Sequence, residues 1–221
     1  MNRNSTLLQL LWALYPFAAL LLHFTVGERW RAAENATSLR SEALSFEQKG
    51  NLQKAALLYG AAGKAALPYD LPLRARLKID AARVAILLGE PFQGVEQMEK
   101  LLAEPSAKTL PGLLRSEANA ICALGLYYAA YALRLDKNEP ELWQQEAADA
   151  RAIFLKLHEN ALRLNRPDEA AFYGRNLEAA IRLQREKLAE IAVNPPPPAS
   201  LAARDRSVFV KKMERMEKRG S

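Results

Sequence analysis

Apolar residues follow helical spacing along most of this chain, and no stretch shows the sustained alternation with β-branched residues that is typical of a strand. The pattern predicts helices over residues 28–49, 52–67, 113–135 and 141–164. It also predicts a pair of helices on either side of Gly89 and a last long helix that reaches Ile191. Short turns with Gly, Asn or Pro separate these stretches, so we expect an all-α protein built from antiparallel helical hairpins.

The first 27 residues have a different pattern, since residues 7–26 contain no Asp, Glu, Lys or Arg. As a helix these twenty residues would measure about 30 Å, the thickness of the hydrocarbon core of a bilayer. We therefore predict a transmembrane signal-anchor helix within residues 1–27, with Trp12 and Trp30 as interfacial aromatics. A cleaved signal peptide and a buried soluble helix are the alternatives; the charged residues that follow the stretch disfavour cleavage.

The predicted localisation is a single-pass protein of a bacterial inner membrane. A short segment ahead of a large domain favours export of the body to the extracytoplasmic side, because long domains translocate largely regardless of charge. The arginines at positions 29, 31 and 40 favour the opposite orientation. Both orientations stay open.

The most specific pattern lies between residues 39 and 68, where small and aromatic residues recur around a Gly-Asn turn. Small residues would allow two antiparallel helices to approach, aromatic residues would fill the seam, and the glycine would end the first helix. One hairpin of this kind cannot bury its own apolar face, so neighbouring hairpins must stack on it. The residues with these packing roles are Ala43, Phe46, Gly50, Ala55, Tyr59, Ala62 and Pro68, with Gly89 as the turn of a second, weaker copy.

This spacing resembles the tetratricopeptide repeat (TPR), although the step from Gly50 to Gly89 is 39 residues rather than about 34 and residues 106–192 fit loosely. The resemblance implies a TPR-like solenoid over residues 28–193, with a concave groove that holds an extended or helical peptide. The first helix of each hairpin would line this groove. At matching positions stand Arg40, Leu44, Asp80, Arg83, Arg115 and Asn119. A subclass that grips a terminal carboxylate has Lys and Asn where this chain has Arg40 and Leu44, so that clamp is not expected.

No catalytic chemistry is predicted, because the chain lacks phosphate-binding glycine loops, a Gly-x-Ser-x-Gly elbow and a His-Glu-x-x-His motif. Its carboxylates alternate with Arg and Lys at helical spacing, as on a solvated helix face. The single cysteine, Cys122, lies in an apolar helical run and is expected to be a small buried residue. His23 and His158 lack neighbouring ligands in the sequence, so we expect neither a cofactor nor a metal.

The net charge of +6 is concentrated at the C-terminus. Residues 199–221 hold seven Lys or Arg and three Asp or Glu, a net charge of 7 − 3 = +4, and they follow a polyproline linker at residues 194–198. We predict a basic, disordered tail; the alternative is a segment that folds onto a partner or an anionic membrane. The body lacks a basic stripe, so nucleic acid is not an expected partner.

These patterns predict a membrane-anchored scaffold that binds another protein or a peptide segment through its groove. The architecture of one anchor, a repeat body and a short tail is similar to that of bacterial membrane-anchored accessory proteins that assist assembly. The alternative is a permanent structural subunit of a larger membrane complex. In that case Tyr127, Tyr128 and Tyr131 would need a neighbour outside the chain.

Overall fold

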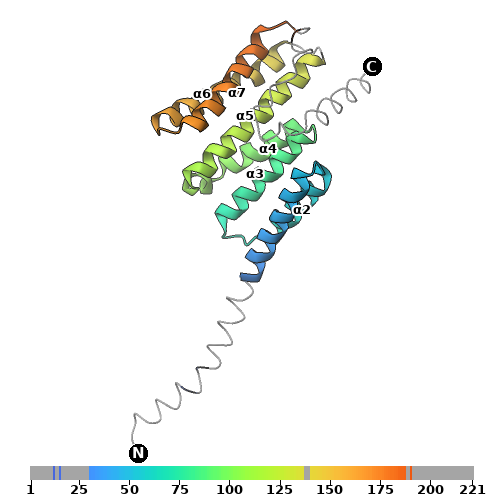
Figure 1. The fold of residues 1–221 in the computed structure, drawn as a ribbon, viewed down its shortest axis with the longest axis vertical. Coiled ribbons are helices and arrows are strands. Elements are labelled where there is room, and N and C mark those ends of the chain that lie inside the picture. Colours follow the sequence, from blue (N-terminus) through green and yellow to red (C-terminus); the bar gives the residue numbers. More distant parts are fainter. Residues whose placement is uncertain (1–11, 13–14, 16–29, 137–139, 188–189, 191–221) are drawn as a thin grey trace, which may run out of the picture.

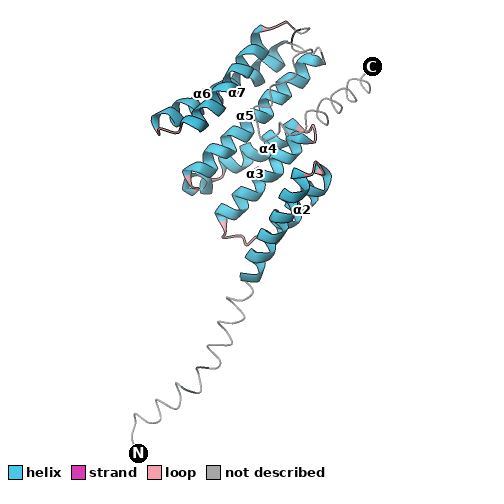
Figure 2. Ribbon diagram, in the orientation of Figure 1, coloured by secondary structure: helices cyan, strands magenta, loops and turns pink. Residues whose placement is uncertain are grey.

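A computed structural model describes residues 12, 15, 30–136, 140–187 and 190 of the 221-residue chain. All regular structure among these residues is helical, which confirms the all-α prediction (Figure 2). The polyproline linker, the basic tail and the predicted span lie outside the described residues, apart from Trp12 and Tyr15, which are helical and exposed. In the described part of the chain, no helix combines the length and the apolar character needed to cross a bilayer.

The helices agree with the predicted ranges to within a few residues, with two differences. An unpredicted 3-10 helix follows α4 and buries Ala107, and the last helix ends at Arg185, where Glu186 adopts an extended conformation. The first helix covers residues 30–48 and is called helix 30–48 below. It is followed by α2 (Leu52–Ala65), α3 (Leu71–Leu87), α4 (Pro91–Ala103), η1 (Pro105–Thr109), α5 (Gly112–Leu135), α6 (Pro140–Arg163) and α7 (Pro167–Arg185).

Each helix from α2 to α7 packs against its neighbours in the chain, and the helices form an ordered stack from α2 at one end to α6 and α7 at the other (Figure 1). In addition, α3 contacts α5, and α5 contacts α7. Helix 30–48 meets α3 through the contact of Arg40 with Asp80. Alternate helices therefore form two layers, which we call the A layer (helix 30–48, α3, α5 and α7) and the B layer (α2, α4 and α6).

Three of the reversals between helices use a residue with a left-handed backbone. Gly50 has a φ of 77° after helix 30–48, Gly89 has a φ of 80° after α3, and Asn165 has a φ of 53° after α6. Glycine adopts this conformation without steric cost, and asparagine is the residue that most often replaces it at a helix end. Asn51, the residue after Gly50, caps α2, because its side chain accepts a hydrogen bond of 3.2 Å from the Lys54 amide.

The first hairpin is closely packed around small residues. Ala43, Ala55 and Ala62 are completely buried, and Tyr59 is 1% exposed. Phe46 is half-buried against the core, and the Lys54 ammonium lies 3.9 Å from the centre of its ring. Pro68 is exposed in the turn before α3, where its carbonyl accepts a hydrogen bond of 3.0 Å from Arg74.

The aromatic cluster on α5 is covered by the chain itself. Tyr127, Tyr128 and Tyr131 are each between 6% and 7% exposed, and the rings of Tyr127 and Tyr128 meet edge to face with centroids 5.5 Å apart. The neighbours that the permanent-subunit alternative would require for these tyrosines are supplied within the chain, because α5 packs against both α4 and α6.

Arg134 joins the C-terminal ends of α5 and α7. Its guanidinium donates to the carbonyls of Leu183 and Glu186, which are acceptors left open at the end of α7, and it lies 4.4 Å from the centre of the Trp143 ring on α6. A single cation on α5 therefore contacts the two helices that follow it in the chain.

Cys122 is 4% exposed in α5, and burial, followed by the nearby charges of Glu99, Glu146 and Asp149, raises the pKa of its thiol to about 11. At pH 8 only about one thiol in a thousand is ionised at such a pKa, and the thiolate is the reactive form. We expect Ellman's reagent to leave the native protein unlabelled on a timescale that labels it fully in 6 M guanidinium chloride. Rapid labelling of the native protein would show that α5 opens readily.

Candidate functional site

The contact between the first hairpin and α3 is made by a chain of charged side chains. Arg83 on α3 donates to both carboxylate oxygens of Glu47, each at 2.9 Å, and its Nη1 donates to Asp80 Oδ1 at 2.8 Å. Asp80 Oδ2 accepts a 2.6 Å bond from Arg40 Nε, and Glu47 accepts a 2.7 Å bond from the Tyr59 hydroxyl. We call Arg40, Glu47, Tyr59, Asp80 and Arg83 the interhelical network.

The interhelical network holds its charges in a buried environment, since Asp80 is 1% exposed and Arg83 is 5% exposed. Burial by itself lowers the pKa of the Arg83 guanidinium, but its hydrogen bond to Glu47 and the charges of Asp80 and Glu47 outweigh this effect and raise the pKa above its ordinary value. Burial also raises the pKa of the Tyr59 hydroxyl, and its hydrogen bond to Glu47 raises it further. Arg83 therefore stays charged, and Tyr59 stays a neutral donor.

The network involves three of the six residues that the sequence places in a groove, namely Arg40, Asp80 and Arg83. Leu44 is half-buried and packs against the core of the protein. Arg115 is exposed on α5, and the half-buried Asn119 donates a 2.7 Å hydrogen bond to the Arg115 carbonyl one turn earlier. Asp80 and Arg83 are buried, and Arg115 is the only one of the six that is fully exposed.

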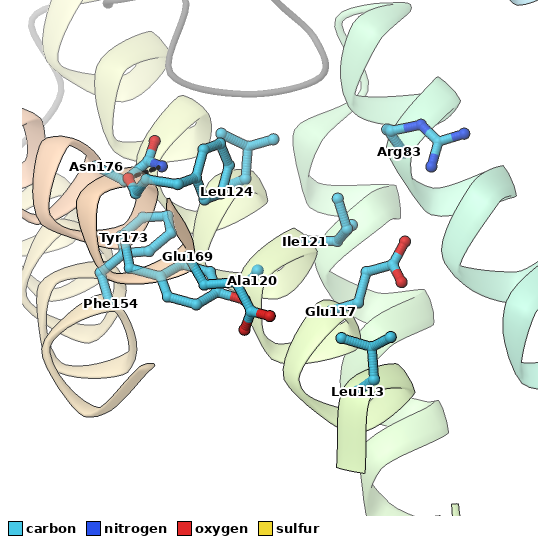
Figure 3. Close-up of a pocket in the computed structure, with 11 residues that line it drawn as sticks. Arg83, Leu113, Glu117, Ala120, Ile121, Leu124, Phe154, Glu169, Tyr173 and Asn176 are labelled. Carbon is cyan, nitrogen blue, oxygen red and sulfur yellow. Dashed lines mark hydrogen bonds between the residues drawn. The ribbon is translucent and has the colours of Figure 1, made fainter. Parts of the chain in front are cut away.

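A pocket of about 220 Å³ opens in the A layer between α5 and α7 (Figure 3). Leu124, Phe154, Tyr173 and Asn176 are grouped at one end, and Arg83 of the interhelical network lies at the other end. Apolar side chains supply most of its wall, and their exposure ranges from buried, as for Phe154, to 55% for Leu113. The remaining lining residues are Glu117, Ala120, Ile121, Glu169 and Phe172.

Two carboxylates give the pocket its electrostatic character. Glu117 pairs with Arg76 on α3, and Glu169 lies 3.4 Å from Arg166 in an exposed ion pair. The pKa of the Tyr173 hydroxyl is raised by burial first, then by the charges of Glu169 and Glu117, while Arg166 opposes them. Both carboxylates therefore act on the interior of the pocket. Arg83 adds little positive charge, because Asp80 and Glu47 already neutralise it.

The sequence contained a signal for this pocket that the TPR resemblance did not select. The lining residues on α5 are at positions 113, 117, 120, 121 and 124, and those on α7 are at positions 169, 172, 173 and 176. Successive positions in each set are therefore one, three or four residues apart. Such intervals place side chains on one face of a helix. The stripes are visible in the sequence, but the sequence does not show that they lie opposite each other across a pocket.

Comparisons of the chain with protein-family models, with curated proteins and with solved structures found no match. The chemistry of the pocket therefore carries the assignment. In the described ranges, no group of three or more His, Cys, Asp or Glu side chains is placed to hold a metal ion. An apolar pocket with acid groups beside it suits an apolar side chain that is followed or preceded by a cation.

Proposed function

We propose that this chain is a TPR-like scaffold that recruits another protein by binding a peptide segment of that protein on the A layer. Membrane attachment through residues 7–26 belongs to the same proposal and rests on the uncharged stretch in the sequence. The chain performs no catalysis in this proposal. Its contribution is to hold the partner beside the membrane.

The observation that carries the proposal is the pocket between α5 and α7. It lies in the layer formed by the first helices of the hairpins, which is the layer that the TPR resemblance assigns to the groove. A large apolar side chain transferred from water into such a pocket contributes about 1.5–3 kcal/mol. Peptide recognition of this kind uses a few anchor side chains in pockets and weaker contacts elsewhere.

Two further features support a stacked-hairpin scaffold. The contacts of α3 with α5 and of α5 with α7 repeat along the chain, as expected when each hairpin packs only on its neighbours. The left-handed turns at Gly50 and Gly89 recur at equivalent places, at the ends of the first helices of the first two hairpins, helix 30–48 and α3. The main argument for the permanent-subunit alternative was that the tyrosines of α5 would need an external neighbour. That argument no longer holds, since these tyrosines are buried within the chain.

Filling the pocket tests the function directly. Random 12-residue peptides displayed on phage are selected against the full chain in detergent, and binding of the enriched peptides is measured by fluorescence anisotropy. Ala120 lines the pocket and is half-buried, so Ala120→Phe should place a ring where the anchor side chain binds. We expect the affinity to fall about 10-fold to 100-fold, the equivalent of losing one buried anchor.

The matched control is Ala152→Phe, which makes the same change at an exposed position of α6 in the B layer. It should leave the affinity unchanged. Enriched peptides should share a large apolar residue next to Lys or Arg. Equal binding by both variants would place the peptide elsewhere, and a selection that enriches no sequence would reject the scaffold proposal.

A further inference from the structure

The tail of this chain contains the chemistry that the pocket between α5 and α7 is suited to bind. Phe209 lies between two valines, and Lys211 and Lys212 follow directly. An aromatic anchor and two cations thus occur within four residues, in a tail with a net charge of +4. The pocket offers apolar walls together with Glu117 and Glu169.

The ion pairs of the two carboxylates leave room for a further cation. Glu169 and Arg166 are an exposed pair separated by 3.4 Å, an arrangement that contributes little and exchanges readily with solvent. Glu117 and its partner Arg76 are both about one quarter exposed. A lysine beside the pocket would interact with both acid groups, which already act together on Tyr173.

The chain between α7 and Phe209 is long enough for this contact. Phe172 lies 13 residues before the end of α7 at Arg185, which is about 20 Å along the helix axis. The 23 residues between Arg185 and Phe209 have a root-mean-square span of about 25–30 Å as a flexible chain, and about 70 Å when extended like polyproline. Attachment to the same chain also gives the tail an effective concentration on the order of millimolar at the pocket.

We propose that residues 208–212 of the same chain occupy the pocket between α5 and α7, with the ring of Phe209 inserted beside Ala120 and Ile121. The lysines at positions 211 and 212 pair with Glu117 and Glu169. This inference deepens the proposed function and rests on it, because a partner peptide has to displace the tail before it binds. The tail then acts as a competitor that sets the affinity threshold for partners.

Disulfide trapping in the full chain tests the contact. Oxidation of the double variant Ala120→Cys/Val210→Cys, which keeps the Phe209 ring, should give a monomeric cross-link about tenfold faster than Ala152→Cys/Val210→Cys, whose first cysteine lies on the exposed face of α6. The single variant Val210→Cys controls for Cys122. Glu117→Gln/Glu169→Gln, added to the first double variant, should slow trapping, and so should 0.5 M NaCl.

Each outcome decides the proposal. Equal trapping at positions 120 and 152 would show that the tail has no preferred site, and a disulfide-linked dimer at position 120 would assign the pocket to the tail of a second copy; either result overturns it. Selected peptides that slow trapping at position 120 support competition. If peptides bind at Ala120 but the tail is never trapped there, the scaffold function stands and this inference fails.

Discussion

Arg83→Met is expected to lower the free energy of unfolding by about 3 kcal/mol, because it removes the arginine that pairs with both the buried Asp80 and the half-buried Glu47. Removing one member of a buried ion pair costs about 3–5 kcal/mol. The lower end applies here, since Arg40 still pairs with Asp80 and the Tyr59 hydroxyl still donates to Glu47. Urea unfolding followed by circular dichroism at 222 nm measures the change.

Lys100→Met is the matched control for this prediction. Lys100 and its partner Glu96 form an ion pair on α4 at 2.6 Å, but their side chains are 72% and 62% exposed. Exposed i,i+4 pairs contribute only about 0.3–0.5 kcal/mol, so the variant should unfold almost as wild type does. If Arg83→Met costs no more than Lys100→Met, the interhelical network is not what joins the first hairpin to α3.

Gly94→Ala is expected to destabilise the protein by about 2 kcal/mol although alanine is the better helix former. A Cβ atom at residue 94 would lie 2.5 Å from Ile86 Cγ1 and 3.0 Å from the Ala82 carbonyl oxygen on α3. Since the carbonyl belongs to a helix backbone, relief requires α4 to move away from α3. The same urea titration measures this loss.

The same substitution at Gly60, Gly60→Ala, is expected to change the stability in the opposite direction. Gly60 lies in the middle of α2, and among the residues that the structure describes no atom outside its own helical turns comes within 4 Å of a Cβ placed there. Alanine in a helix interior is favoured over glycine by about 0.5–1 kcal/mol, so this variant should be more stable than wild type. Stabilisation by both variants would mean that the contact between α3 and α4 is looser than the structure shows.

A second close contact, at Gly125, bears on the pocket as well. Gly125 on α5 lies under Val95 of α4, where an added Cβ would come within 2.6 Å of Val95 Cγ2. Close approach of α3, α4 and α5 therefore fixes the position of α5, and α5 supplies one wall of the pocket. A variant that moves α4, such as Gly94→Ala, should therefore lower the affinity for the peptide as well as the free energy of unfolding.

Local rules explain which features were predictable. Apolar spacing placed the helices, and the turn at Gly89 followed from a glycine between two helical stripes. The 3-10 helix Pro105–Thr109 was missed, because its five residues are too few to show a helical period. The TPR resemblance implies groove roles for Asp80 and Arg83 by matching position, whereas the structure buries both. Spacing gives the face of a helix but not the partner that covers it.

The sequence by itself determined the all-α class, the order of the helices and the turns that separate them, because these depend on residues a few positions apart. Only the tertiary structure decided that Arg83 pairs with Glu47 and that Arg40 pairs with Asp80. It also placed Glu117 of α5 and Glu169 of α7 at one pocket. Contacts between residues 36 or more positions apart depend on how whole helices pack, and helical periodicity does not show which helices pack together.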